Sequence, residues 1–193
     1  MVTQLLKRQF TTQDYHQMVV AGILSEDERV ELIQGEIVKM SPIGIRHASC
    51  VNRLLKLFLL SLGDRTTVIV QNPVILSNLS EPQPDLALLK PRDDFYAAGH
   101  PQPQDILLLV EVADTTIESD FAERTLREGT IKIPLYASSR ISEVWLVDVN
   151  QQVVEIFREP TANSYQYTQK FPQGEIFVQA FPNVSFAVKQ ILG

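Results

Sequence analysis

The sequence predicts an α/β fold around a central sheet, and three observations carry that prediction. Residues 106–112 (ILLLVEV) form a continuously apolar run, which is typical of a strand covered on both faces. Residues 47–62 carry apolar side chains at helical spacing, so an amphipathic helix is available to cover the sheet. The 193 residues suffice for one full core, and no linker-like stretch divides them. We therefore expect a single domain over residues 1–193.

A helix and a hairpin are expected before this core. Thr11 is a suitable N-cap, and Asp14 three residues later makes a variant of the capping box, so the pattern predicts a helix that runs to Leu24. Residues 29–40 alternate between apolar and polar side chains around Gln34–Gly35. That alternation around a turn predicts a β-hairpin.

The middle of the chain predicts a helix and then strands. The helix at residues 47–62 ends at Gly63–Asp64. Residues 66–70 are rich in β-branched side chains and predict a strand that continues toward Leu76. The apolar residues 86–89 predict the next strand.

The second half predicts one more helix and mainly strands. A helix is expected at residues 119–139, and the apolar residues 143–149 predict a buried strand. The last residues, 186–192, fit either a short helix or a strand. Shorter antiparallel strands are predicted at residues 153–158, 165–170 and 175–179.

The net charge, the cysteine count and the lengths of the apolar runs exclude several classes of protein. The chain has 17 Lys and Arg against 23 Asp and Glu, a net charge of −6, so it exerts no overall attraction on phosphate backbones. Its single cysteine, Cys50, excludes an internal disulfide and a multi-cysteine zinc site. The first residues lack a signal-peptide pattern, and the apolar runs are shorter than the roughly 20 residues that span a bilayer. We expect a soluble, cytoplasmic protein.

Two carboxylates stand in unusual places. Glu111 interrupts the most apolar strand, and Asp85 precedes another apolar run directly after Pro84. A buried carboxylate needs a cation, a metal or hydrogen-bond donors. Two carboxylates on adjacent strands can hold one hard divalent ion, and the backbone carbonyl of Val112 can add a third oxygen. The alternative is that each acid pairs with an arginine or caps a helix.

The acids belong to an ordered set of segments. Asp85 and Glu111 form a PD…EVA pattern that resembles the PD-(D/E)xK nuclease superfamily. Five segments together, covering roughly residues 29–158, resemble the Uma family of restriction endonucleases. They are VELIQGEIVKMSPIGIRHASCVNRL, VQNPVILS, EPQPDLALLKPR, ILLLVEVADTTIESD and IKIPLYA…EVWLVDV.

The resemblance implies a restriction-endonuclease-like core, a central mixed sheet flanked by helices. The N-terminal helix and hairpin and the C-terminal antiparallel strands would be additions to it. It also implies DNA as substrate and Mg²⁺ between Asp85 and Glu111, with Mn²⁺ as a substitute. A homodimer is a further expectation from the resemblance. The alternative is a catalytically weak or inactive binding or regulatory module on the same fold, which the net charge favours.

The catalytic lysine departs from the usual pattern. The superfamily lysine stands two residues after the glutamate, where this chain has Ala113. In proteins that this chain resembles, a lysine follows on the next helix, and the matching position is either Arg124 or Lys132, eight residues apart. The two cannot occupy one point on a straight helix. We favour Lys132, because the flanking IPLYA matches better.

Accessory site residues are also predicted. Glu31 is a candidate extra acid near the metal, and His47 could reach a metal-bound water or a phosphate. The resemblance suggests Gln71 as a polar site residue and Asp120 as the residue that orients the lysine. Each has a structural alternative. Glu31 could be a hairpin charge and His47 a helix cap. Gln71 could be a strand-end amide and Asp120 an acid at a helix N-terminus. Tyr136 is interpreted as a core residue.

Overall fold

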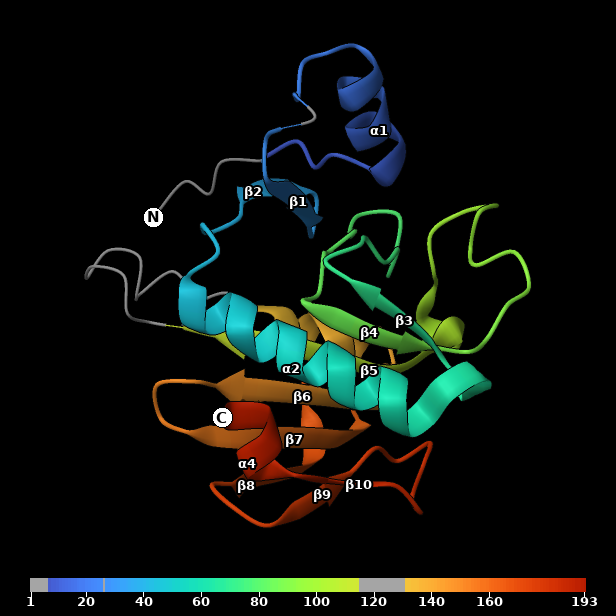
Figure 1. Ribbon diagram of the computed structural model, residues 1–193. Helices are drawn as coiled ribbons and strands as arrows, with labels where there is room; N and C mark the ends of the chain where they lie inside the picture. The colour runs from blue at the N-terminus through green and yellow to red at the C-terminus, as the bar shows by residue number, and fades with distance from the viewer. Residues whose placement is uncertain (1–6, 26, 115–130) are drawn as a thin grey trace.

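A mixed six-stranded sheet organises the chain (Figure 1). The structure is a computed structural model that describes residues 7–25, 27–114 and 131–193. Within those residues the strand order is β3-β4-β5-β6-β7-β8. The strands are β3 (Thr67–Val70), β4 (Leu86–Leu89), β5 (Ile106–Ala113), β6 (Glu143–Asp148), β7 (Val153–Pro160) and β8 (Tyr165–Phe171). The sheet confirms the predicted α/β fold with a central mixed sheet.

β5 lies inside the sheet, as its continuous apolarity predicts. It pairs antiparallel with β4 and parallel with β6, while the other neighbouring strands pair antiparallel. A parallel pair needs a crossover connection, and residues 131–138 supply helical structure there. The rest of the predicted helix at residues 119–139 lies largely outside the described residues.

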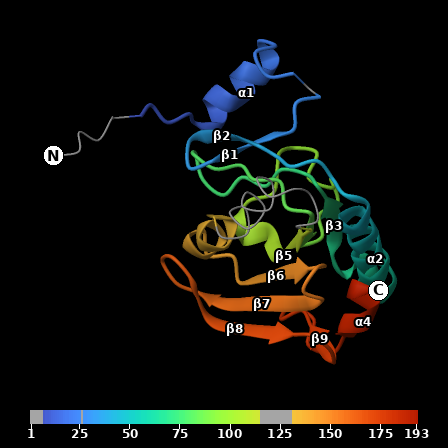
Figure 2. The same cartoon turned by 90° about the vertical axis from the view of Figure 1, so that its left-hand side faces the viewer.

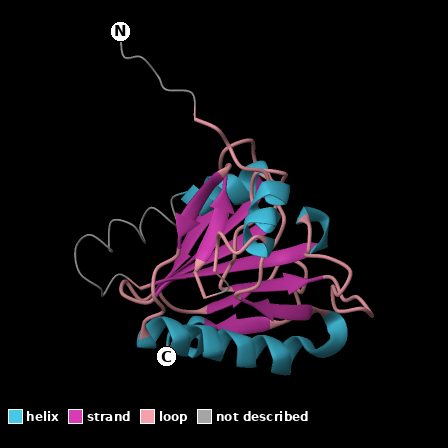
Figure 3. Cartoon of the chain, turned by 90° about the horizontal axis from the view of Figure 1, so that it is seen from above, coloured by secondary structure: helices cyan, strands magenta, loops and turns pink. Residues whose placement is uncertain are grey.

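Helix α2 (Ile45–Leu62) covers one face of the sheet, as Figure 3 shows from above. Its buried side chains pack against Leu86, Leu88, Leu108 and Val110. Alternate residues of the same strands, Ala87, Leu89 and Leu109, pack on the other side with Leu135 and Tyr136 of the 131–138 helix. The sheet is therefore covered on both faces by helices.

The N-terminal elements sit at the end of the molecule away from β8 (Figure 2). They are α1 (Thr12–Val20), β1 (Val30–Ile33) and β2 (Glu36–Lys39). Thr11 and Asp14 form the predicted capping box, although α1 ends at Val20 rather than Leu24. Gln34 and Gly35 have φ of 52° and 78°, the left-handed turn that a two-residue hairpin requires.

Two other segments differ from the sequence expectation. β3 ends at Val70 and does not continue toward Leu76, because Gln71 has φ of 51° and turns the chain out of the strand. At the C-terminus both alternatives occur in succession. After β9 (Glu175–Phe177), the last segment forms β10 (Ser185–Ala187) against β9 and then helix α4 (Val188–Leu192).

In the part of the chain that the structure describes, no helix combines the length and the apolarity needed to cross a membrane.

Candidate active site

The ends of two adjacent strands bring Asp85 and Glu111 together. Leu86 lies opposite Val110 in the antiparallel pair of β4 and β5. Asp85, just before Leu86, and Glu111, just after Val110, therefore lie at the same end of the two strands. Both acids line one cavity of about 80 Å³. The backbone N–H of Val112 donates to Asp85 Oδ2 at 2.8 Å, which fixes that carboxylate against β5. The cavity also contains Lys132, His47 and Glu31.

Strand alternation points Glu111 at the 131–138 helix. Glu111 shares a sheet face with Leu109, which packs against that helix. Two of the helix's residues meet the carboxylate. The Tyr136 hydroxyl donates a short hydrogen bond to Glu111 Oε1, and Lys132 Nζ lies 3.4 Å from the same oxygen.

Lys132 is held from three sides. Its Nζ lies 3.0 Å from Glu31 Oε2, and it donates to the backbone carbonyl of Gln83 at 3.5 Å. Glu31, on β1, is itself fixed by the backbone N–H of Gln83 at 3.0 Å. Burial would lower the pKa of Lys132, but the carboxylates of Glu111 and Glu31 raise it above the ordinary value. The ammonium group is therefore positively charged at neutral pH.

Helix α2 and the end of β3 supply the contacts of Asp85. His47 Nε2 lies 2.9 Å from Asp85 Oδ1, and Gln71 Nε2 donates to the same oxygen at 3.3 Å. Burial would raise the pKa of Asp85, but the hydrogen bond and charge of His47 lower it. Burial acts to lower the pKa of His47, and the Asp85 carboxylate outweighs it and raises that pKa. Asp85 is thus held as a carboxylate, with His47 as its hydrogen-bond partner.

Glu111 is the acid of the cavity whose ionised form is strongly disfavoured by its surroundings. Burial raises its pKa to about 8, and the Asp85 charge adds to the increase although Lys132 and Tyr136 oppose it. Four acidic side chains (Glu31, Asp85, Glu111 and Asp114) line the cavity, and the basic side chains that line it with them are Lys132, Arg29 and His47. The arrangement favours an additional positive charge at the two strand ends.

The structure brings most of the predicted site residues together. Asp85, Glu111, Lys132 and Val112 line one cavity, and Glu31 and His47 line it with them. Gln71 reaches the cavity through its hydrogen bond to Asp85. Asp120 and Arg124 lie outside the described residues.

Sequence reasoning missed two contributors. Tyr136 is fully buried, as predicted for a core residue, yet its hydroxyl also holds Glu111. Its position four residues after Lys132 places both on one helix face, and that spacing was the available signal. Gln83 acts through its backbone, which binds both Glu31 and Lys132, and a backbone contribution leaves no mark on the sequence.

Comparison with known proteins agrees with the fold. The chain is an α/β protein of restriction-endonuclease-like fold, with a central mixed sheet flanked by helices. The family model Uma2, described as "Putative restriction endonuclease", matches residues 12–189, so the chain belongs to the Uma2 family. A crystal structure from Anabaena variabilis ATCC 29413, described as "a putative nuclease belonging to DUF820", is similar with a TM-score of 0.70 and 15% identity. The match covers 95% of this chain and 97% of that one. No curated protein matches the chain.

Proposed function

We propose that this protein is a magnesium-dependent endonuclease that hydrolyses DNA phosphodiester bonds. The observation that carries the proposal is the Lys132 ammonium group, 3.4 Å from the Glu111 carboxylate in the cavity that Asp85 also lines. Two acids and a lysine are the groups that metal-dependent phosphodiester hydrolysis uses. Membership in a family described as "Putative restriction endonuclease" supports the same chemistry.

The residues present fit a hard divalent ion. Asp85 and Glu111 offer carboxylate oxygens, the ligand type that Mg²⁺ prefers, and the excess of negative charge in the cavity favours a cation. In this proposal Asp85, Glu111 and the backbone carbonyl of Val112 hold Mg²⁺, for which Mn²⁺ can substitute. When bound, the ion would polarise the scissile phosphodiester and lower the pKa of an attacking water.

The protein's own side chains then have separate roles. Lys132 stabilises the negative charge that develops on the phosphate, or orients the water. Glu31 and Gln83 fix the ammonium group in place, and Tyr136 does the same for the Glu111 carboxylate. His47 holds Asp85 with Nε2, while its buried Nδ1 has no hydrogen-bond partner among the described residues.

DNA affinity should be weak and sensitive to salt. The net charge of −6 opposes a polyanion, and several arginines are engaged in the fold. Arg53 donates to the carbonyls of Ile191 and Leu192, and Arg92 pairs with Asp94. Arg29 lines the cavity, although it also donates to the Ser41 carbonyl. Binding should therefore concentrate on the cavity and its immediate surroundings.

The test is plasmid and oligonucleotide cleavage at low salt with Mg²⁺ or Mn²⁺. Asp85→Asn and Lys132→Met should each lower the cleavage rate at least about 100-fold. Lys170→Met is the matched control, because Lys170 is an exposed lysine on β8 that pairs with Glu155. Cleavage that continues unchanged in Asp85→Asn would contradict the proposal. Metal binding without cleavage in the wild type would instead support the inactive binding or regulatory module.

A further inference from the structure

A second group of metal-ligand side chains lies outside the cavity just described. His16, Glu81 and His100 each offer one ligand atom, and in the described part of the chain these three atoms lie within 4.8 Å of one another. None of the three lines the Asp85 cavity. The chain has three histidines, so two of them meet here. This group goes beyond the proposed nuclease site.

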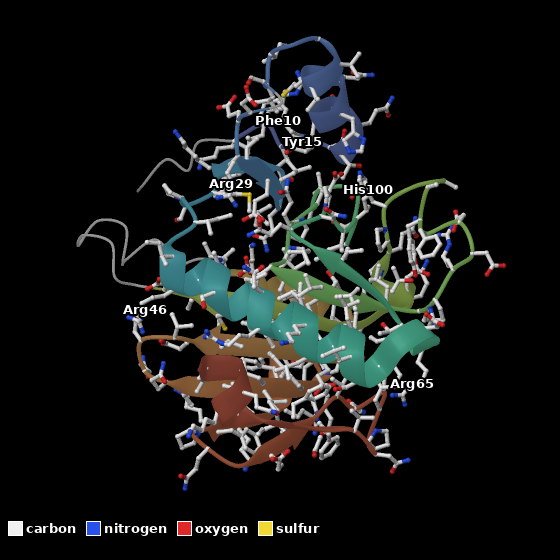
Figure 4. All side chains as sticks on the ribbon, in the orientation of Figure 1. Phe10, Tyr15, Arg29, Arg46, Arg65 and His100 are labelled. Carbon is white, nitrogen blue, oxygen red and sulfur yellow. The ribbon has the colours of Figure 1, made fainter. Side chains whose placement is uncertain are left out.

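Backbone hydrogen bonds hold the three segments in place independently of any ligand. The α1 helix, which carries His16, is tied by the Thr12 N–H to the Asn78 carbonyl at 2.8 Å. Glu81 donates its N–H to Leu32 of β1 at 2.8 Å. The loop of His100 is held by the Ile75 N–H, which donates to the Pro101 carbonyl at 2.9 Å. Figure 4 shows His100 on this loop close to α1.

The buried acid of the cluster has an imidazole as its basic partner. The Glu81 side chain is 3% exposed, and its carboxylate oxygen lies 2.7 Å from His16 Nε2. Among the described residues no lysine or arginine nitrogen lies within 4.0 Å of it. A buried carboxylate is costly without a positive partner. Two imidazoles that converge on such a carboxylate can supply that partner by sharing a cation.

We propose that His16, Glu81 and His100 bind one divalent transition-metal ion, with zinc as the probe. Two imidazole nitrogens and one carboxylate oxygen form a donor set that suits zinc, whereas magnesium prefers oxygen ligands alone. The His16 and His100 ring centroids lie 6.3 Å apart, and the three ligand atoms, within 4.8 Å of one another, would move closer together to bind one ion. Both rings are exposed, so a remaining coordination position faces solvent and takes water.

The bound ion would cross-link three segments that the sequence keeps far apart. It would fasten α1 to the loops that carry Glu81 and His100. Since α1 packs through few buried side chains, with Tyr15 as its buried residue, the metal would add to the backbone hydrogen bonds that already hold this N-terminal part in place.

The test is zinc binding to the full chain, measured by calorimetry and by the imidazole ¹H–¹⁵N signals. It is run in the wild type and in the Asp85→Asn background, which removes an acid from the other cavity. We expect one zinc equivalent that shifts the His16 and His100 signals in both. His16→Gln and His100→Gln should each lose that equivalent or bind it at least about 10-fold more weakly.

The matched control is Gln17→Ala, an exposed position next to His16 on α1. It should bind zinc as the wild type does. Because His16 and His100 are exposed, both substitutions should leave the fold intact. Unchanged zinc binding in both histidine variants, or no zinc-dependent shift of their signals in the wild type, would overturn the proposal. Neither outcome depends on whether the protein cleaves DNA.

Discussion

One buried glutamate and one partly buried glutamate on neighbouring strands show how the same residue type can serve structure or chemistry. Glu143 begins β6, and Glu111 lies near the end of β5, which pairs parallel with β6. Glu143 accepts hydrogen bonds from Trp145 Nε1 at 2.9 Å, Arg158 Nε at 2.9 Å and the Gln179 N–H at 2.6 Å. Its carboxylate is enclosed by donors and does not line the cavity of Asp85 and Glu111.

Glu111 differs in what surrounds it. It meets Tyr136 and Lys132 but also borders a cavity that a second acid, Asp85, shares. Burial raises the pKa of both glutamates, so the pKa direction does not separate them. The comparison teaches that a buried acid with a complete set of donors supports the fold. A buried acid beside a cavity and a second acid is available for binding.

The largest expected difference between the two concerns metal affinity. Glu111→Gln should weaken Mn²⁺ binding at least about 100-fold, because it removes one of the two carboxylates proposed to hold the ion. Glu143→Gln should bind Mn²⁺ as the wild type does. Calorimetric titration measures both, and equal affinities in the two variants would break the comparison.

The free energy of unfolding should fall more in Glu143→Gln than in Glu111→Gln, the reverse of the order for metal affinity. Glu143→Gln should lower the free energy of unfolding by about 1–3 kcal/mol, because an amide cannot accept from all the donors that face Glu143. Glu111→Gln should change it by less than about 1 kcal/mol, because a carboxyl with a pKa of about 8 is largely neutral at pH 7 and a neutral amide of the same shape replaces it. Urea denaturation of both variants measures this. A larger loss in Glu111→Gln than in Glu143→Gln would contradict the assignment of roles.

Tyr136→Phe tests the role of Glu111 separately, because it removes a hydrogen bond to Glu111 and leaves Glu143 unchanged. Loss of the hydroxyl leaves the carboxylate less firmly oriented, so Mn²⁺ affinity and cleavage should each fall about 10-fold. Tyr165→Phe is the control, because its hydroxyl donates to the Ile141 carbonyl, away from the cavity. If the two variants cleave DNA equally well, Tyr136 has no positioning role.

The last prediction lies outside the two glutamates and concerns Cys50, a titratable group in the core that does not line the Asp85 cavity. Burial raises its pKa to about 11, against an ordinary 9.0, and its side chain is fully buried on α2. The thiolate fraction at pH 8 is therefore about 100-fold below that of the unfolded chain. Iodoacetamide should label the native protein at least that much more slowly than the protein in urea. Equal labelling rates would show that this part of the core opens readily.

Much of the site followed from the sequence because its acids violate the apolar pattern of their strands. Asp85 and Glu111 stand out for that reason, and Lys132 was favoured over Arg124 through its flanking residues. The structure places Lys132 against Glu111, although the roles of all three residues stay predictions. Glu143 also begins an apolar strand, and only its donors reveal that it is structural.

The remainder depends on tertiary geometry that periodicity does not encode. The left-handed backbone of Gln71 ends β3 early, and Asn72–Pro73, directly after it, is the sequence signal for that turn that the strand prediction passed over. The convergence of His16, Glu81 and His100 requires three separate backbone connections. Local patterns predict elements and their faces, but not which loops from distant parts of the chain meet.

The most direct test of the nuclease assignment is the rate of plasmid cleavage by Glu111→Gln and Glu143→Gln, each normalised to its folded fraction, in the presence of Mg²⁺. The account predicts that Glu143→Gln cleaves at the wild-type rate and that Glu111→Gln is at least about 100-fold slower. Equal rates in the two variants would contradict it.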